Sequence, residues 1–206
     1  MTARSWRFAS TYVIIPRENI DTDQIIPARF LTTTDRQGLG PRAFHDWRYL
    51  ADGSKNPDFA LNQLESRGAE VLVAGHNFGC GSSREHAVWA LAGAGFRAVI
   101  SSEFADIFRG NALVNGLLPI EVAPEILARL IANDAAGQHV VVDLETQTLT
   151  LPDGDEVRFP IPAFSRYSLL NDTDEMSFLL DASPSIGAYE ESHPSSIDTT
   201  LLRAAR

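Results

Sequence analysis

The sequence predicts an α/β protein with parallel strands in its central part and antiparallel strands added after them. Apolar runs of strand length occur at residues 71–75, 95–100 and 116–122, and helical segments at 87–92, 104–112 and 125–132 alternate with them. Strands that alternate with helices usually pair in parallel through crossover connections. Beyond them, β-rich runs at 140–144, 148–151 and 157–159, with a Pro-Asp-Gly turn between the last two, indicate antiparallel pairing.

The remaining elements follow in chain order. Residues 11–15 predict a first strand ended by Pro16, and residues 43–50 predict a helical turn. Between them, residues 32–41 are polar, contain glycine and show no period, which is typical of a mobile loop over a site. A final helix is expected at 175–180. Residues 1–206 therefore form one domain, with a flexible tail expected from about residue 187.

The composition excludes several classes of function. The chain has 206 residues, 44% of them hydrophobic and 21% charged, which suits a domain with a sizeable core. Its net charge of −10 disfavours binding to nucleic acid or to an anionic membrane surface. No apolar run approaches the roughly 20 residues of a transmembrane helix, and the first eight residues lack a signal-peptide core. A cytoplasmic location is expected.

The cysteine count limits metal chemistry. Cys80 is the only cysteine, and the five histidines show no HExxH-type spacing. One thiolate cannot hold an iron–sulfur cluster or a zinc site of several cysteines, so no metal bound by this chain is expected. Cys80 itself is interpreted as a small residue filling a turn, with an activated thiol as the alternative.

The segment Asn77–His86 (NFGCGSSREH) carries the strongest functional signal. It follows a strand-like run and precedes a helix-like one, so it predicts a glycine-rich turn that opens a helix. Backbone amides at a helix start, together with Arg84, can receive a carboxylate or phosphate. Ser82 and Ser83 stand where such an anion would bind. A serine that takes a proton needs its alkoxide stabilised, and the same amides and cation would do this.

Specific missing residues weaken three other interpretations of this turn. A dinucleotide fingerprint lacks its third glycine, a nucleophile elbow would need glycine where Cys80 stands, and a phosphate-binding Walker loop lacks its lysine. A structural alternative remains, in which a serine only caps the helix. Asp21 and Asp23 could likewise form an ordinary turn or orient a group at the site. Arg36 could be solvated or could clamp a distant carboxylate.

Three ordered motifs carry a resemblance to a known family. They are Asn19–Pro27 (NIDTDQIIP), Asn77–His86, and Phe104–Phe108 followed by Gly116–Pro119 (GLLP). With these motifs, most of the chain resembles the swivelling domain of the aconitase superfamily, and in particular the small subunits of bacterial isopropylmalate isomerases. The resemblance implies a domain of β/β/α layers.

The resemblance also implies roles for individual residues. Ser82 would be the base that removes the proton α to a carboxylate, and Asp23 would support the acid side of the site. Four residues would bind substrate: Gly81, Ser83, Arg84 and Arg36, with Arg36 aligned near the family's second carboxylate-binding arginine. A separate large subunit would hold a four-iron four-sulfur cluster. The substrate would be a small dicarboxylate, 2-isopropylmalate, converted to 3-isopropylmalate by dehydration and rehydration in leucine biosynthesis.

Other functions remain open at this point. A related hydro-lyase small subunit could act on homoaconitate, citraconate or dimethylmalate. A binding module without catalysis could capture carboxylates or a nucleotide at the turn, and the partial glycine pattern leaves an NAD-dependent enzyme as a further alternative.

Overall fold

The computed structural model describes residues 5–32, 35–64, 68–133 and 138–193. Within them, seven strands form one sheet in the order β4-β3-β2-β1-β5-β6-β7. The parallel half contains β1 (Arg7–Ile15), β2 (Val71–Ala74), β3 (Ala98–Ser101) and β4 (Leu118–Glu121). The antiparallel half contains β5 (His139–Asp143), β6 (Thr148–Thr150) and β7 (Glu156–Arg158). The predicted fold class is confirmed.

The strands β2, β3 and β4 are buried on both faces, which explains their continuous apolar sequences. In β2, Leu72 and Ala74 face one hydrophobic core, and Val71 and Val73 face a second core on the other side. The side-chain period of two in a strand places alternate residues on opposite faces. The sheet therefore lies between two cores.

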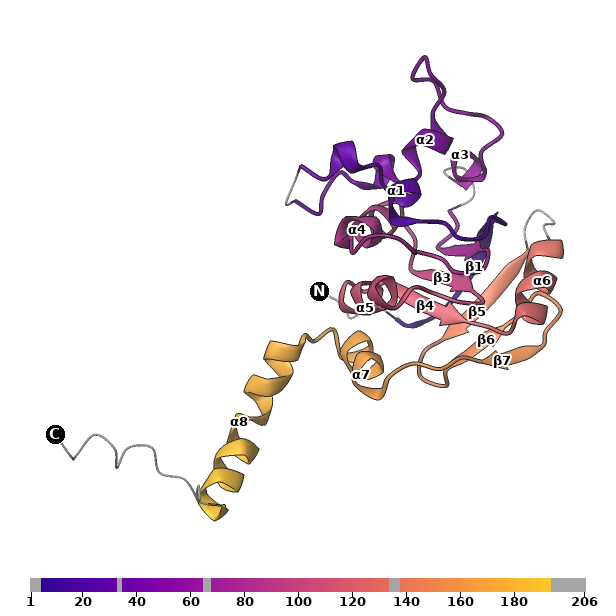
Figure 1. Cartoon of the computed structure of the whole chain (residues 1–206). Helices are drawn as coiled ribbons and strands as arrows, with labels where there is room; N and C mark the ends of the chain where they lie inside the picture. The colour runs from indigo at the N-terminus through magenta and orange to yellow at the C-terminus, as the bar shows by residue number, and fades with distance from the viewer. Residues whose placement is uncertain (1–4, 33–34, 65–67, 134–137, 194–206) are drawn as a thin grey trace.

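Helices cover the first core, and the curled antiparallel strands close over the second (Figure 1). On the first side lie α1 (Thr22–Ile25), α2 (His45–Arg48), α3 (Ala60–Leu64), α4 (Glu85–Gly93) and α5 (Asp106–Val114), with 3-10 turns η1 (Ala28–Phe30) and η2 (Gly40–Arg42). On the second side lie α6 (Pro124–Ala132) and α7 (Ala163–Asn171), through Leu127, Leu130 and Leu169. The helices α3 and α7 were not predicted from the sequence.

The loop at 32–41 is packed at its carboxyl-terminal end. Leu39 is buried, and a Cβ on Gly40 would overlap the backbone of Gly93 in α4. Arg48 donates from Nη1 to the carbonyl of Gly40 at 3.2 Å. Residues 33–34 lie outside the described residues, and the predicted mobility of the loop stays a prediction.

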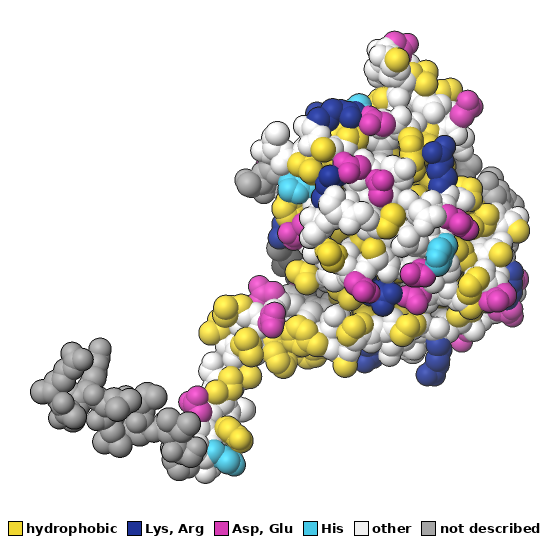
Figure 2. All heavy atoms as spheres, viewed as in Figure 1, with side chains coloured by type: hydrophobic (Ala, Val, Ile, Leu, Met, Phe, Trp, Pro, Cys, Tyr) yellow, Lys and Arg dark blue, Asp and Glu magenta, His cyan; other side chains and the backbone are white. Residues whose placement is uncertain are grey.

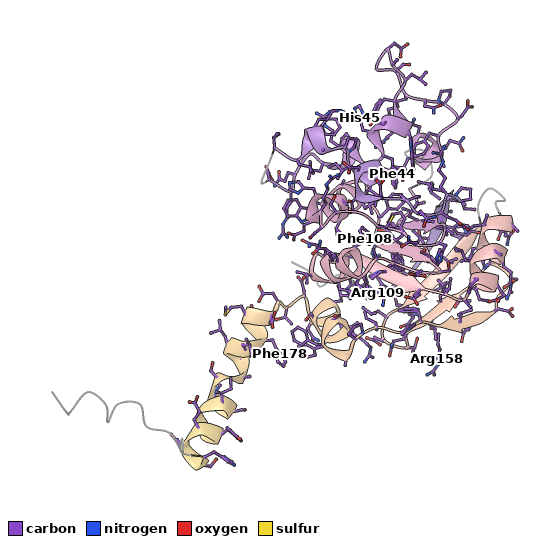
Figure 3. All side chains as sticks on the ribbon, viewed as in Figure 1. Phe44, His45, Phe108, Arg109, Arg158 and Phe178 are labelled. Carbon is purple, nitrogen blue, oxygen red and sulfur yellow. The ribbon has the colours of Figure 1, made fainter. Side chains whose placement is uncertain are left out.

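Helix α8 (Glu175–Ser192) leaves the body of the molecule (Figure 1) and buries none of its side chains. It continues beyond residue 187, where a flexible tail was predicted. Residues 194–206 lie outside the described residues, and the flexibility of the tail stays a prediction. Phe178 lies at the α7 end of the helix (Figure 3), and its ring contacts those of Phe164 and Tyr167 at 5.2 and 5.5 Å between centroids.

No helix in the described ranges combines the length and the apolar character that crossing a membrane requires. The cytoplasmic location stays a prediction.

Candidate functional site

The glycine-rich turn between β2 and α4 is held by the segment that leads into α1. The amide of Gly79 donates to the carbonyl of Ile20 at 2.8 Å, and the amide of Thr22 donates to the carbonyl of Cys80 at 2.9 Å. The buried hydroxyl of Thr22 donates to the carbonyl of Ser82 at 3.0 Å. These three bonds fix the backbone of the turn immediately before its two serines.

Two glycines let the turn approach its neighbours closely. Gly79 and Gly81 have φ angles of +77° and +91°, which other residues adopt only with strain. A Cβ on Gly79 would also overlap the ring of Phe108 in α5, whereas a Cβ on Gly81 would lie 3.3 Å from the Cβ of Asp21. The glycines therefore fix the path of the chain between α1 and α5.

Asp21 has a structural role at the start of α1. Its side chain accepts a hydrogen bond from the amide of Gln24 at 2.7 Å, and the Gln24 side chain accepts from the amide of Asp21 at 3.0 Å. This reciprocal capping box stabilises the helix start that carries Thr22 and Asp23. The spacing of Asp21 and Gln24 in the sequence could have predicted it. Asp21 therefore has the local structural role that was one of its two interpretations, but it caps a short helix rather than forming an ordinary turn.

The two serines do not cap α4. The N-cap residue is Arg84, whose side chain makes no capping hydrogen bond, so the interpretation of a serine as a helix cap was wrong. Ser82 and Ser83 are exposed, and within the described part of the chain neither hydroxyl has a hydrogen-bond partner. The positive end of α4 lies directly after them, where it can stabilise an anion or an alkoxide.

Arg84 and Asp23 are brought together from two different motifs. The Nη1 atom of Arg84 is in ion-pair contact with Oδ1 of Asp23. The arginine side chain is only 17% exposed, whereas the aspartate side chain is 54% exposed. Because a guanidinium has five N–H groups in a fixed plane, one edge can contact Asp23 while another binds a carboxylate. Asp23 thus orients Arg84 beside the two serines.

Cys80 lies in the same turn but is a poor nucleophile. Partial burial raises the pKa of its thiol, and the nearby Asp21 carboxylate raises it further. The thiol is therefore protonated at neutral pH, which favours the structural interpretation of this residue.

Arg36, in the loop at 32–41, lies beside α4, farther from the start of that helix than Arg84. Its guanidinium carbon is 5.2 Å from the centroid of Trp89 in α4. The indole donates from Nε1 to Oδ1 of Asn115 at 2.9 Å, and Asn115 donates from Nδ2 to Glu85 at 2.8 Å. The sequence predicted Arg36 as a site residue but gave no signal for this set of contacts.

The structure therefore groups Gly81, Ser82, Ser83, Arg84 and Asp23, and places Arg36 beside the helix that they open. This group forms an open surface. A cleft of about 700 Å³ lies elsewhere, next to α2, and is lined by residues including Arg29, His45 and Tyr49 (His45 is labelled in Figure 3). None of the predicted site residues lines that cleft.

Comparisons with known proteins indicate the family of the chain. The family model described as the aconitase C-terminal domain matches residues 10–125, and a second model, described as LeuD_N, matches residues 129–163. A 3-isopropylmalate dehydratase small subunit from Anaeromyxobacter dehalogenans is 60% identical over 181 residues, which cover 88% of this chain and 94% of that protein. One from Chloroflexus aurantiacus is 56% identical over 189 residues, 91% of this chain and 94% of that protein.

A solved structure is also similar. The crystal structure of 3-isopropylmalate dehydratase from Methanocaldococcus jannaschii superposes with a TM-score of 0.64 and 26% sequence identity. The match covers 89% of this chain and 99% of that one. Sequence and fold therefore point to the same group of proteins.

Proposed function

Because this chain belongs to the family of 3-isopropylmalate dehydratase small subunits, within the aconitase superfamily, we propose that it provides one half of a hydro-lyase active site. The reaction is the isomerisation of 2-isopropylmalate to 3-isopropylmalate by dehydration and rehydration, in leucine biosynthesis. The large subunit of the enzyme provides the other half. The proposal rests on the family membership and on the grouping of exposed serines, Arg84 and Asp23 at the start of α4.

The observation that carries the proposed mechanism is the position of Ser82. Its carbonyl is fixed by Thr22 at 3.0 Å, while its hydroxyl is exposed. Arg84 and the amides at the start of α4 lower the cost of an alkoxide there, so that Ser82 can take the proton α to a substrate carboxylate. The same hydroxyl returns the proton during rehydration.

The other residues bind and orient the substrate. Arg84 pairs with one carboxylate through the guanidinium edge that does not contact Asp23. The hydroxyl of Ser83 donates a hydrogen bond to the same carboxylate. Gly81, which carries no side chain, leaves room for the substrate beside the turn. Asp23 keeps Arg84 in place and supports the acid side of the site. Arg36 binds the second carboxylate.

The cluster that the family uses does not fit this chain. The chain has one cysteine, and three thiolates are needed. Among the described residues, no group of three His, Cys, Asp or Glu side chains could hold a metal ion. We therefore assign the four-iron four-sulfur cluster to the large subunit.

The test uses the chain together with its large subunit. Mixing the two is expected to give isopropylmalate turnover that the isolated chain lacks. In the complex, Ser82→Ala should lower kcat by about 100- to 10,000-fold, because a positioned base contributes rate enhancement of that order. Ser83→Ala should mainly raise KM.

A matched control is available on α8. Ser183 is exposed like Ser82 but lies on the projecting helix, so Ser183→Ala should leave kcat and KM unchanged. Full turnover by the isolated chain, or an undiminished kcat in Ser82→Ala, would refute the proposed function.

A further inference from the structure

We propose that Trp89 is a positioning residue for substrate binding, because its indole holds Arg36 beside the helix that carries the carboxylate site. This inference rests on the proposed function of Arg36. It adds Trp89, which was not among the site residues predicted from the sequence.

The first step is the contact itself. A guanidinium 5.2 Å from an indole centroid is within the range of a cation–π interaction, and tryptophan is the strongest aromatic partner for it. Trp89 is half-buried, so one part of the ring packs on the core while another remains accessible to Arg36. The indole therefore serves as a platform for a loop side chain.

The platform is itself fixed. The Nε1 atom of Trp89 donates to Asn115, which follows α5, and Asn115 also donates to Glu85 and to the carbonyl of Asn111, both at 2.8 Å. The ring of His86 lies 4.6 Å from the indole centroid. Glu85 directly follows Arg84 in the chain. The contacts that orient Trp89 thus extend to the residue next to the carboxylate-binding arginine.

The second step is the distance along the helix. Trp89 follows Arg84 by five residues, a rise of about 7.5 Å along α4. The loop that carries Arg36 is anchored four residues later by the close contact of Gly40 with Gly93. The loop therefore runs along α4, and Trp89 holds its arginine within about one and a half turns of Arg84. Both arginines thus border the same helix, Arg84 at its start and Arg36 beside its second turn.

The main test is a double-mutant cycle, measured on the complex with its large subunit and 3-isopropylmalate. Trp89→Leu should raise KM about 2- to 5-fold, the loss expected for an exposed cation–π contact, with kcat changed less than about twofold. Trp89→Phe keeps an aromatic face and should restore most of the KM. Arg36→Gln should raise KM at least as much, and adding Trp89→Leu to it should produce no further increase.

The control is a second tryptophan with an arginine over its ring. The guanidinium of Arg17 lies 4.4 Å from the centroid of Trp47, in α2. Trp47→Leu should lower the melting temperature without changing KM. A purely structural role of Trp89 would likewise lower stability and leave KM unchanged.

A measurement on the isolated chain provides an independent readout. If the indole holds Arg36, trypsin should cut the Arg36–Gln37 bond faster in Trp89→Leu than in the wild type, relative to cutting at Arg42–Ala43. The inference is overturned if Trp89→Leu leaves KM unchanged or lowers it. It is also overturned if Trp89→Leu raises KM by the same factor in the Arg36→Gln variant as in the wild type. If Arg36→Gln itself leaves KM unchanged, the role of Arg36 fails together with the inference. The proposed function fails separately if the wild-type complex shows no turnover.

Discussion

At the scale of single residues, glycines with positive φ angles have different physical reasons to be glycine. Gly79 combines a φ of +77° with a backbone that touches the ring of Phe108. Gly95, just after α4, has a φ of +103° but no atom within 4 Å of a Cβ built on it. A residue with a side chain would strain the backbone at both positions, whereas its Cβ would overlap a neighbour only at position 79.

These differences predict an order of destabilisation. Gly95→Ala should cost about 1–2 kcal/mol, the strain of a left-handed conformation. Gly79→Ala should cost about 2–5 kcal/mol, because overlap with Phe108 adds about 1–3 kcal/mol to the same strain. Gly81→Ala should lie between them, since its Cβ would meet Asp21 at 3.3 Å. Urea unfolding of the isolated chain measures all three, and equal losses for Gly79 and Gly95 would contradict the explanation.

The site residues that the sequence alone predicted are those that are adjacent in the chain. Ser82, Ser83 and Arg84 stand side by side, so their common function follows from one motif. Their partner Asp23 lies about sixty residues earlier. The residues alone left a turn or a role at the site open for it, and its catalytic role came from the family resemblance. The contact of Arg36 with Trp89 could not be predicted, because the two residues are far apart in the sequence and share no motif or repeat.

At the scale of elements, helices and strands were predicted correctly where the pattern of apolar residues in the sequence matches the burial of the element. The strands β2 to β4 are continuous apolar runs because both faces are buried. Helix α8 was predicted only at residues 175–180, and beyond them the sequence contains Pro184, which lacks an N–H for the helix ladder, and Gly187, which disfavours helix. The helix passes both residues, so local propensity alone did not determine its length.

The start of α8 should depend on pH. The carboxylate of Asp174 accepts from the amide of Ser177 at 2.7 Å, and this bond lowers the pKa of Asp174 below its ordinary value. A lowered carboxyl pKa stabilises the folded form above the ordinary value near 4, and this stabilisation is lost as pH falls through the lowered pKa. Protection of the Ser177 amide from exchange should therefore be constant from pH 7 to 5 and decrease below about 4.

An asparagine provides the control for this effect. Asp174→Asn keeps a capping oxygen but cannot titrate. In this variant, the protection of the Ser177 amide should therefore fall with pH only as much as the protection of amides far from residue 174. An acid-induced loss of equal size in Asp174→Asn would show that another group is responsible.

At the scale of the whole molecule, the parallel half of the sheet lies between the site and the antiparallel strands β5 to β7. The turn at 77–84 and α1 lie with α4 and α5 on one side of the parallel strands, and β5 to β7 curl over the other side (Figure 1). Figure 2 shows apolar side chains gathered where α7 meets α8, along with charged groups elsewhere on the visible face. A partner that completes the proposed active site must approach the side that carries Ser82 and Asp23.

This asymmetry predicts where the large subunit leaves its footprint. On forming the complex, amide exchange should slow at the turn 77–84 and at α1, because their open surface becomes covered, while β6 and β7 should exchange as in the isolated chain. Ser82→Ala should leave this footprint intact, since that hydroxyl has no partner within the described residues and serves the reaction rather than the assembly. Hydrogen–deuterium exchange of the isolated and mixed subunits measures both. Protection confined to β6 and β7 would place the partner on the wrong side of the sheet and contradict a shared active site.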